Sequence, residues 1–150
     1  MKKIVSLIYC VALLVFSAQA ASACSCIEVK LDKKAAAVNY KRWLKNFDGA
    51  VFTGRVIKTE KIEADNQLKV TFEVERYWKG VQNDEAVIYT AMDSAACGVS
   101  YTEGETYFVV ARNSDRGLMT DLCSHLEYTK NKQTMLRKLG RGKTPRAKNI

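Results

Sequence analysis

The positions of the cysteines constrain the fold of this chain more than any other feature. Cys24 and Cys26 stand one residue apart, whereas Cys97 and Cys123 lie far along the chain. One intervening residue can hardly accommodate disulfide geometry, so a bridge between Cys24 and Cys26 is not expected. Four cysteines allow three pairings in an oxidising compartment. In the two pairings that remain, the segment around Cys24 is fastened to two distant parts of one folded unit.

The residues ahead of this pair have the three parts of a secretory leader. Lys2 and Lys3 give a positive start, Ile4 to Phe16 is almost wholly apolar, and Ala21-Ser22-Ala23 matches the small-x-small pattern of signal peptidase. The apolar run is too short for a comfortable membrane span. We therefore expect residues 1–23, a signal peptide that includes Cys10, to be removed on export to an extracellular or periplasmic location.

Other processing of the leader stays open. A second small-x-small site, Ala18-Gln19-Ala20, would place cleavage ahead of Ala21, and an uncleaved anchor or a lipoprotein acylated at Cys24 are further alternatives. After cleavage behind Ala23, Cys24 is the first residue of the mature chain. Its α-amine and carbonyl oxygen are then neighbours on one residue, and together they can chelate a metal ion.

Charge is distributed unevenly along the mature chain. Residues 24–127 hold 14 basic and 16 acidic side chains, whereas residues 128–150 hold eight basic and no acidic ones. We expect one domain over residues 24–127, followed by a C-terminal helix and a basic tail that is untethered over residues 141–150. The tail leaves open a contact with a membrane surface or a polyanion. Nucleic acid is not an expected partner, because the chain is exported and its main domain has a net negative charge.

Apolar residues follow patterns that predict five short strands. Apolar and polar residues alternate between Leu68 and Trp78, which indicates a half-buried antiparallel strand, and Gly54 in the preceding strand suggests a bulge or a tight bend. Together the elements favour an all-β fold with flanking helices, a five-stranded Greek-key barrel of the OB type with a disulfide-stapled N-terminus. The expected strands are 50–62, 68–78, 86–91, 106–112 and 118–123, and the expected helices begin at Asp32 and Thr129.

The chain carries no constellation of residues that is typical of an enzyme. His125 is the only histidine, lies in no metal-binding spacing, and is expected to be a surface or packing residue. The cysteines are better used as bridges than as a metal cage. The carboxylate pairs Glu73/Glu75 and Glu103/Glu105 have the spacing of a solvated sheet face. We therefore expect neither an enzyme nor a bound cofactor.

Six short motifs follow one another between residues 24 and 125. They are Cys24-Ser25-Cys26, Val51 to Val56, Phe72-Glu73-Val74 leading into Trp78-Lys79-Gly80, Cys97-Gly98, Gly104 to Ala111, and Cys123. In this order they resemble the tissue inhibitors of metalloproteinases and the wider netrin-like domains. The resemblance implies an OB-fold barrel in which Cys24 is bridged to Cys97 and Cys26 to Cys123.

The same resemblance implies an inhibitor of metalloendopeptidases. In the inhibitors the amine and carbonyl of the first residue, here Cys24, chelate the catalytic zinc of the protease. The side chain of the second residue, here Ser25, enters the specificity pocket beside the zinc, and Ala95-Ala96 packs alongside in the cleft. The implied inhibitory ridge consists of Cys24, Ser25, Cys26, Ile27, Ala95, Ala96 and Cys97.

The chain also differs from the animal inhibitors. It lacks their third disulfide, a basic tail replaces their six-cysteine C-terminal module, and Glu28 stands where a proline usually follows the start motif. An alternative function is therefore a non-inhibitory netrin-like module that binds another extracytoplasmic protein, in one form as an envelope lipoprotein.

Overall fold

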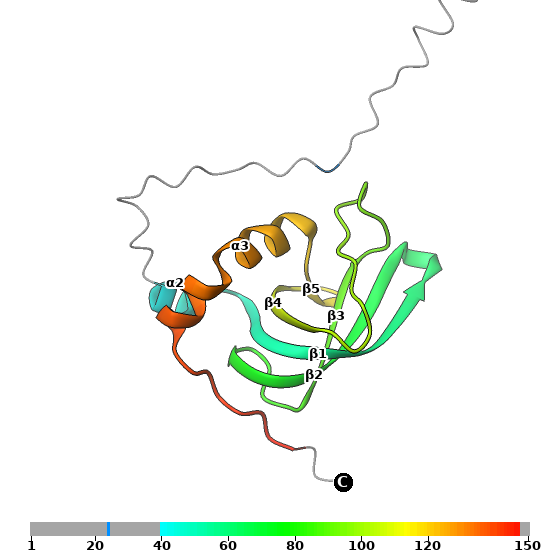
Figure 1. The fold of residues 1–150 in the computed structure, drawn as a ribbon. Coiled ribbons are helices and arrows are strands. Elements are labelled where there is room, and N and C mark those ends of the chain that lie inside the picture. Colours follow the sequence, from blue (N-terminus) through cyan, green and yellow to red (C-terminus); the bar gives the residue numbers. More distant parts are fainter. Residues whose placement is uncertain (1–23, 25–39, 148–150) are drawn as a thin grey trace, which may run out of the picture.

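Five strands close into a barrel in the computed structural model, which describes Cys24 and residues 40–147 (Figure 1). Around the barrel they follow the order β1-β2-β3-β5-β4, with β3 and β5 parallel and every other pair antiparallel. This order confirms the OB-type barrel. The elements are α2 (Tyr40–Asn46), β1 (Gly49–Ile62), the 3₁₀ turn η1 (Glu63–Asp65), β2 (Gln67–Lys79), β3 (Glu85–Ala91), β4 (Thr106–Ser114), β5 (Gly117–Met119) and α3 (Leu122–Leu139).

The interior of the barrel is filled by side chains that alternate along the strands. Val70, Phe72 and Val74 of β2 are buried inside, as their spacing predicts, and Glu73 between them is exposed. The Phe72 ring meets the rings of Phe52 and Tyr101 edge to face, with centroids 5.5 and 5.4 Å apart. Each such side chain contributes roughly 1.5–3 kcal/mol by leaving water.

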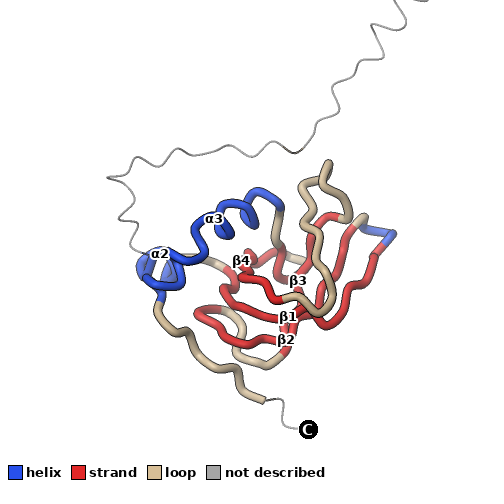
Figure 2. The backbone as a smooth tube through the Cα atoms, viewed as in Figure 1, coloured by secondary structure: helices blue, strands red, loops and turns tan. Residues whose placement is uncertain are grey.

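A second apolar cluster lies outside the barrel, under the helices. Figure 2 shows α2 and α3 on the same side of the strands. Their side chains cover the outward faces of the start of β1 and the middle of β4, so the apolar runs 50–52 and 108–111 are buried on both faces. The buried members are Phe47, Val51, Phe108, Val110 and Met135, and the partly buried ones are Trp43, Leu44, Trp78, Leu136 and Leu139.

The bend expected at Gly54 is present in β1. The register of β1 against β2 shifts between Thr53 and Gly54 and again between Val56 and Lys58. A Cβ on Gly54 would lie 2.8 Å from the carbonyl oxygen of Glu73, so the two backbones approach too closely there for any side chain. This curvature lets one long strand pair with β4 near its start and with β2 along its length.

The end of the barrel differs from the sequence-based expectation. The fifth strand stops at Met119, and α3 begins at Leu122, seven residues ahead of the expected start at Thr129. Asp121 is responsible, because it has an extended backbone and its Oδ1 accepts a hydrogen bond of 2.8 Å from the Ser124 amide. This is N-cap geometry, which satisfies an amide at the helix start. Cys123 therefore lies in the first turn of a helix and not on a strand.

The expectation of an untethered tail is wrong for residues 141–147. The amide and carbonyl of Lys143 exchange hydrogen bonds of 2.7 and 2.9 Å with Tyr77, and the Arg146 amide donates to the Gln82 carbonyl at 2.9 Å. β3 pairs with β2 only as far as Glu73, so the last part of β2 has an open edge. Residues 140–147, here called the C-terminal strap, occupy that edge. No helix in the described part of the chain has the length and apolar character to cross a membrane.

Candidate functional site

Cys24 is joined by a disulfide to Cys97, with their Cα atoms 5.2 Å apart. This is the first of the two bridges that the resemblance implies. Cys97 lies on the loop between β3 and β4, here called the β3–β4 loop (residues 92–105). The bridge spans a sequence separation of 73 residues. The chain-entropy model assigns a loop of this length on the order of 4 kcal/mol of stabilisation.

Cys24 also lies against the first turn of α3. Its Sγ is 3.8 Å from the Sγ of Cys123, and the Leu122 amide donates a hydrogen bond of 2.8 Å to the Cys97 carbonyl. Cys123 is disulfide-bonded as well. Two separate elements therefore hold the half-buried Cys24 in place.

The tip of the β3–β4 loop is stabilised by its own hydrogen bonds. Asp93 accepts two of them at 2.8 Å, from the Ala96 amide to its side chain and from the Gly98 amide to its carbonyl. The Cys97 amide donates to the Ser94 carbonyl at 3.2 Å. Asp is typical of such turns, because its side chain reaches backbone amides a few residues on. Ala95 and Ala96 are thereby fixed in an exposed position next to the bridge.

The Cys97-Gly98 pair sets the direction of the chain as it leaves this tip. Cys97 has a left-handed backbone with φ of 62°, which is uncommon for a residue with a side chain. Gly98 is fully enclosed, and a Cβ there would lie 2.1 Å from the carbonyl oxygen of Ala91. The next amide, that of Val99, donates to the buried Thr90 hydroxyl at 3.0 Å. The loop is therefore anchored to β3 immediately after the cysteine.

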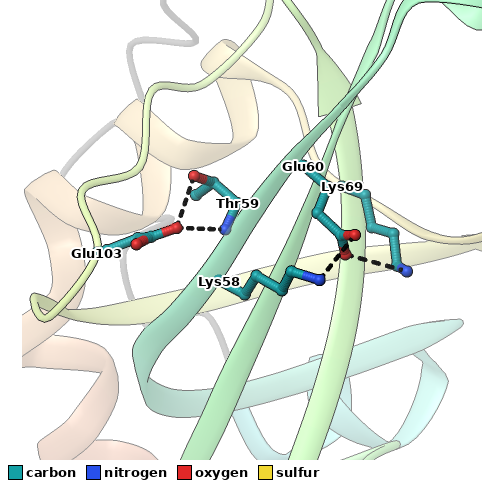
Figure 3. A network of polar contacts seen from close by, with 5 residues as sticks. All are labelled: Lys58, Thr59, Glu60, Lys69 and Glu103. Carbon is teal, nitrogen blue, oxygen red and sulfur yellow. Dashed lines mark hydrogen bonds and ion pairs between the residues drawn. The ribbon is translucent and has the colours of Figure 1, made fainter.

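The far end of the β3–β4 loop is anchored to β1. Figure 3 shows Glu103, whose Oε1 accepts hydrogen bonds from the amide and the hydroxyl of Thr59 at 2.7 and 3.0 Å. The Gly104 amide also donates to the Val56 carbonyl at 2.8 Å. The expectation that Glu103 belongs to a solvated sheet face is therefore wrong. β4 begins only at Thr106, and Glu103 is a loop residue that bonds a strand amide.

An exposed charge network adjoins this contact on β1 and β2. Glu60 accepts from Lys58 at 2.9 Å and from Lys69 at 3.3 Å (Figure 3). The hydrogen bond from Lys58, followed by that from Lys69, lowers the pKa of the Glu60 carboxyl. Exposed ion pairs of this kind contribute little to stability, so this network adds little to the anchoring of the β3–β4 loop.

Aromatic side chains connect the β3–β4 loop with β4 and α3. The Tyr101 ring meets the Tyr107 ring at 4.9 Å and the His125 ring at 6.1 Å, both nearly edge to face. Burial raises the pKa of the Tyr101 hydroxyl and lowers the pKa of the His125 imidazole. His125 is a packing residue, in line with one of the two roles that its sequence context predicts.

We expect His125 to make the protein less stable in mild acid. Burial holds its pKa in the folded protein below the ordinary value of 6.5, so the unfolded chain takes up the proton first as pH falls. The free energy of unfolding should therefore be unaffected by His125 above about pH 7.5 and decrease below about pH 6.5, until the folded imidazole is protonated too. Urea unfolding between pH 5 and pH 8 measures this slope. His125→Gln should flatten it, and an unchanged slope in that variant would contradict the assignment.

The structure brings together four of the seven predicted ridge residues, namely Cys24, Ala95, Ala96 and Cys97. Ser25, Cys26 and Ile27 lie outside the described residues, so the bridge between Cys26 and Cys123 stays a prediction. The sequence analysis did not identify the roles of Asp93 and Glu103 in holding the loop. Asp93 had a usable signal, since Asp-Ser followed by small residues is a typical turn sequence.

No group of three or more histidine, cysteine, aspartate or glutamate side chains in the described part of the chain is placed to hold a metal ion. The chain was also compared with known proteins. No protein-family model matches it, and neither does any curated protein sequence.

Proposed function

We propose that the protein is an exported inhibitor of zinc metalloproteases that acts through its mature N-terminus. The observation that carries this proposal is the placement of Cys24, which is bridged to the β3–β4 loop and packed against the first turn of α3. With the leader removed after Ala23, this residue offers a free α-amine and a carbonyl oxygen from a fixed position. These two atoms close a five-membered ring with a metal ion.

The target protease provides a zinc ion with a coordination position that the N-terminus can occupy. A catalytic zinc has three protein ligands and a fourth position held by water, which the N-terminus displaces when it binds with both atoms. The amine must be neutral to act as a ligand. With a reference pKa near 8, its deprotonation at pH 7 costs only about 1 kcal/mol. Since the disulfide fixes Cys24 in advance, little further ordering is needed on binding.

The neighbouring residues of the ridge suit a narrow cleft. Ala95 and Ala96 are small and exposed, and the Asp93 turn holds them next to Cys97. In the proposed complex they lie along one wall of the protease cleft, while Ser25 enters the pocket beside the zinc and Cys26 and Ile27 continue the ridge. A small second residue such as Ser25 restricts this pocket contact to targets that do not require a large side chain.

The proposed location is extracellular or periplasmic. The Cys24–Cys97 disulfide supports it, because such bridges persist in oxidising compartments. The expected leader over residues 1–23 supplies the route. In this setting the inhibitor meets exported proteases and not those of the cell interior.

The decisive experiment compares the mature protein with a variant that carries one extra alanine ahead of Cys24. Mass spectrometry first establishes that the secreted protein begins at Cys24 with an unmodified amine. Both proteins are then assayed against a panel of zinc metalloproteases with a fluorogenic peptide, and a serine protease is the control. We expect the extra residue to weaken inhibition by at least ~100-fold, about 2.7 kcal/mol, since it converts the amine into an amide.

The extended variant should melt at the same temperature as the mature protein, which separates loss of chelation from loss of folding. Equal inhibition by the two proteins would contradict the proposal. So would an acylated N-terminus, which would favour the netrin-like binding module as the function.

A further inference from the structure

A cavity of about 560 Å³ that is open to solvent lies at the other end of α3, between the outer face of the barrel and the C-terminal strap. Its volume falls within the range of small-molecule sites. Its walls come from β1, β2, the last turn of α3 and the beginning of the strap. The lining residues are Thr53, Arg76, Trp78, Leu136, Gly140 and Arg141.

The strap is fixed to the cavity wall through Trp78. The indole Nε1–H donates to the Gly140 carbonyl at 3.0 Å, and Gly142 lies so close to the ring that a Cβ would be 2.9 Å from Cε2. Gly142 also has φ of +69°, a backbone that disfavours other residues. Together with the two bonds between Lys143 and Tyr77, these contacts hold the backbone of Arg141 at the cavity.

Two arginines meet there. The Arg76 Nη1 donates to the Arg141 carbonyl at 3.4 Å, so the guanidinium of one approaches the backbone of the other. No carboxylate of the described residues lies within ion-pair distance of either arginine. The surrounding sequence adds further positive charge, since residues 128–150 hold seven basic side chains besides Arg141 and no acidic ones. Both arginines line the cavity and neither forms an ion pair with a carboxylate of the described residues, and guanidinium groups bind phosphate, sulfonate and carboxylate groups through charge-assisted hydrogen bonds.

The other side chains that line the cavity are apolar or uncharged. Trp78 and Leu136 contribute partly buried apolar surface that continues the cluster under the helices, and Thr53 contributes a hydroxyl. A small inorganic anion would leave this apolar surface exposed to water. An anion attached to an aromatic or aliphatic body would cover it, and burial of that body would add to the affinity.

We propose that this cavity binds an anionic group carried on an apolar body. The charged group lies between Arg76 and Arg141, and the apolar part lies against Trp78 and Leu136. The site is independent of the proposed inhibitory ridge. It lies beside the last turn of α3 whereas Cys24 lies beside the first, and 18 helical residues span about 27 Å.

The test uses the full mature chain labelled with ¹⁵N and three probes: phenyl phosphate, inorganic phosphate and phenol. The chain has two tryptophans, so Trp43→Phe assigns the indole signal of Trp78. We expect phenyl phosphate to shift that signal and to bind at least 10-fold more tightly than either phosphate or phenol. Equal binding of phenol and phenyl phosphate would overturn the proposal, because the arginines would then contribute nothing.

Variants locate the binding. Arg76→Gln and Arg141→Gln should each weaken phenyl phosphate binding by roughly 10-fold, since each removes one charge-assisted contact while the backbone bonds of the strap stay in place. Arg55→Gln is the matched control, because Arg55 is an exposed arginine that pairs with Glu73 and does not line the cavity. Equal weakening by all three substitutions would indicate general surface charge and overturn the site.

A competition arm identifies the source of the anion. Vesicles of phosphatidylglycerol that displace phenyl phosphate, where phosphatidylcholine vesicles do not, would assign a lipid headgroup to the cavity. Vesicles of both kinds that leave phenyl phosphate bound would assign a soluble anion. Vesicle binding that persists undiminished in Arg76→Gln and Arg141→Gln, without displacement of the probe, would count against a headgroup in this cavity.

Discussion

Replacing Gly98 by alanine is expected to lower the free energy of unfolding by about 3 kcal/mol, the upper end of the usual cost of overpacking. The new Cβ would lie 2.1 Å from the carbonyl oxygen of Ala91 and 2.7 Å from that of Asp93. Both neighbours are backbone atoms, so neither a rotamer change nor a flexible side-chain end can relieve the contact. The β3–β4 loop must move away from β3, which also displaces Cys97 and the disulfide. Thermal unfolding followed by circular dichroism should show a midpoint lower by roughly 10 °C.

Gly104 provides a control on the same loop. It has φ of +86°, but nothing lies within 4 Å of the Cβ that an alanine would add. Gly104→Ala should therefore cost only the conformational penalty of a left-handed backbone, about 1 kcal/mol. The difference between the two variants isolates the steric contact at Gly98. Equal losses would show that the loop end at Gly98 can move freely, which would contradict the rigid mounting of Ala95, Ala96 and Cys97.

The strands could be predicted from the sequence because their signals are local. The alternation of Val70, Phe72 and Val74 indicates a strand that is buried on one face. The continuous apolar run from Phe108 to Ala111 indicates a strand segment that is buried on both faces. Gly54 indicated the bend in the first strand. These patterns depend only on neighbours along the chain, so they can be recognised without knowing which elements pack against the strands.

The start of α3 could not be predicted because the sequence there also suits a strand. The position of the strap could not be predicted because its partner, Tyr77, is distant in the sequence. Leu118 to Cys123 is apolar enough for a strand, and only the N-cap bond that Asp121 accepts from the Ser124 amide shows that a helix begins there. The strap is polar and basic, which is typical of a solvated tail. Its backbone pairs with Tyr77 only because β3 leaves that edge of β2 open. The anion cavity depends on this pairing, so no sequence pattern indicated it.

Removing the Cys24–Cys97 bridge by replacing both cysteines with serine should cost on the order of 4 kcal/mol, the chain-entropy value for its loop. The sequence separation of 73 residues is what makes the expected loss large. Urea unfolding of the double variant under oxidising conditions measures it. A loss near zero would show that α3 and the β3–β4 loop hold Cys24 without the bridge.

Replacing Cys97 alone is expected to have a different result, because the thiol of Cys24 then lies 3.8 Å from the Sγ of Cys123. The Cys24 thiolate can attack that sulfur, form a Cys24–Cys123 bond and release the previous partner of Cys123 as a thiolate that takes up a proton. Cys97→Ser should therefore contain peptides linked through Cys24 and Cys123, detectable by mass spectrometry after proteolysis, and the double variant cannot form them. If the single variant keeps a free Cys24 thiol and its remaining bridge unchanged, the two sulfurs do not approach each other in solution. The N-terminus would then be held by the bridge to Cys97 alone, and the proposed inhibitory ridge would lose its second support.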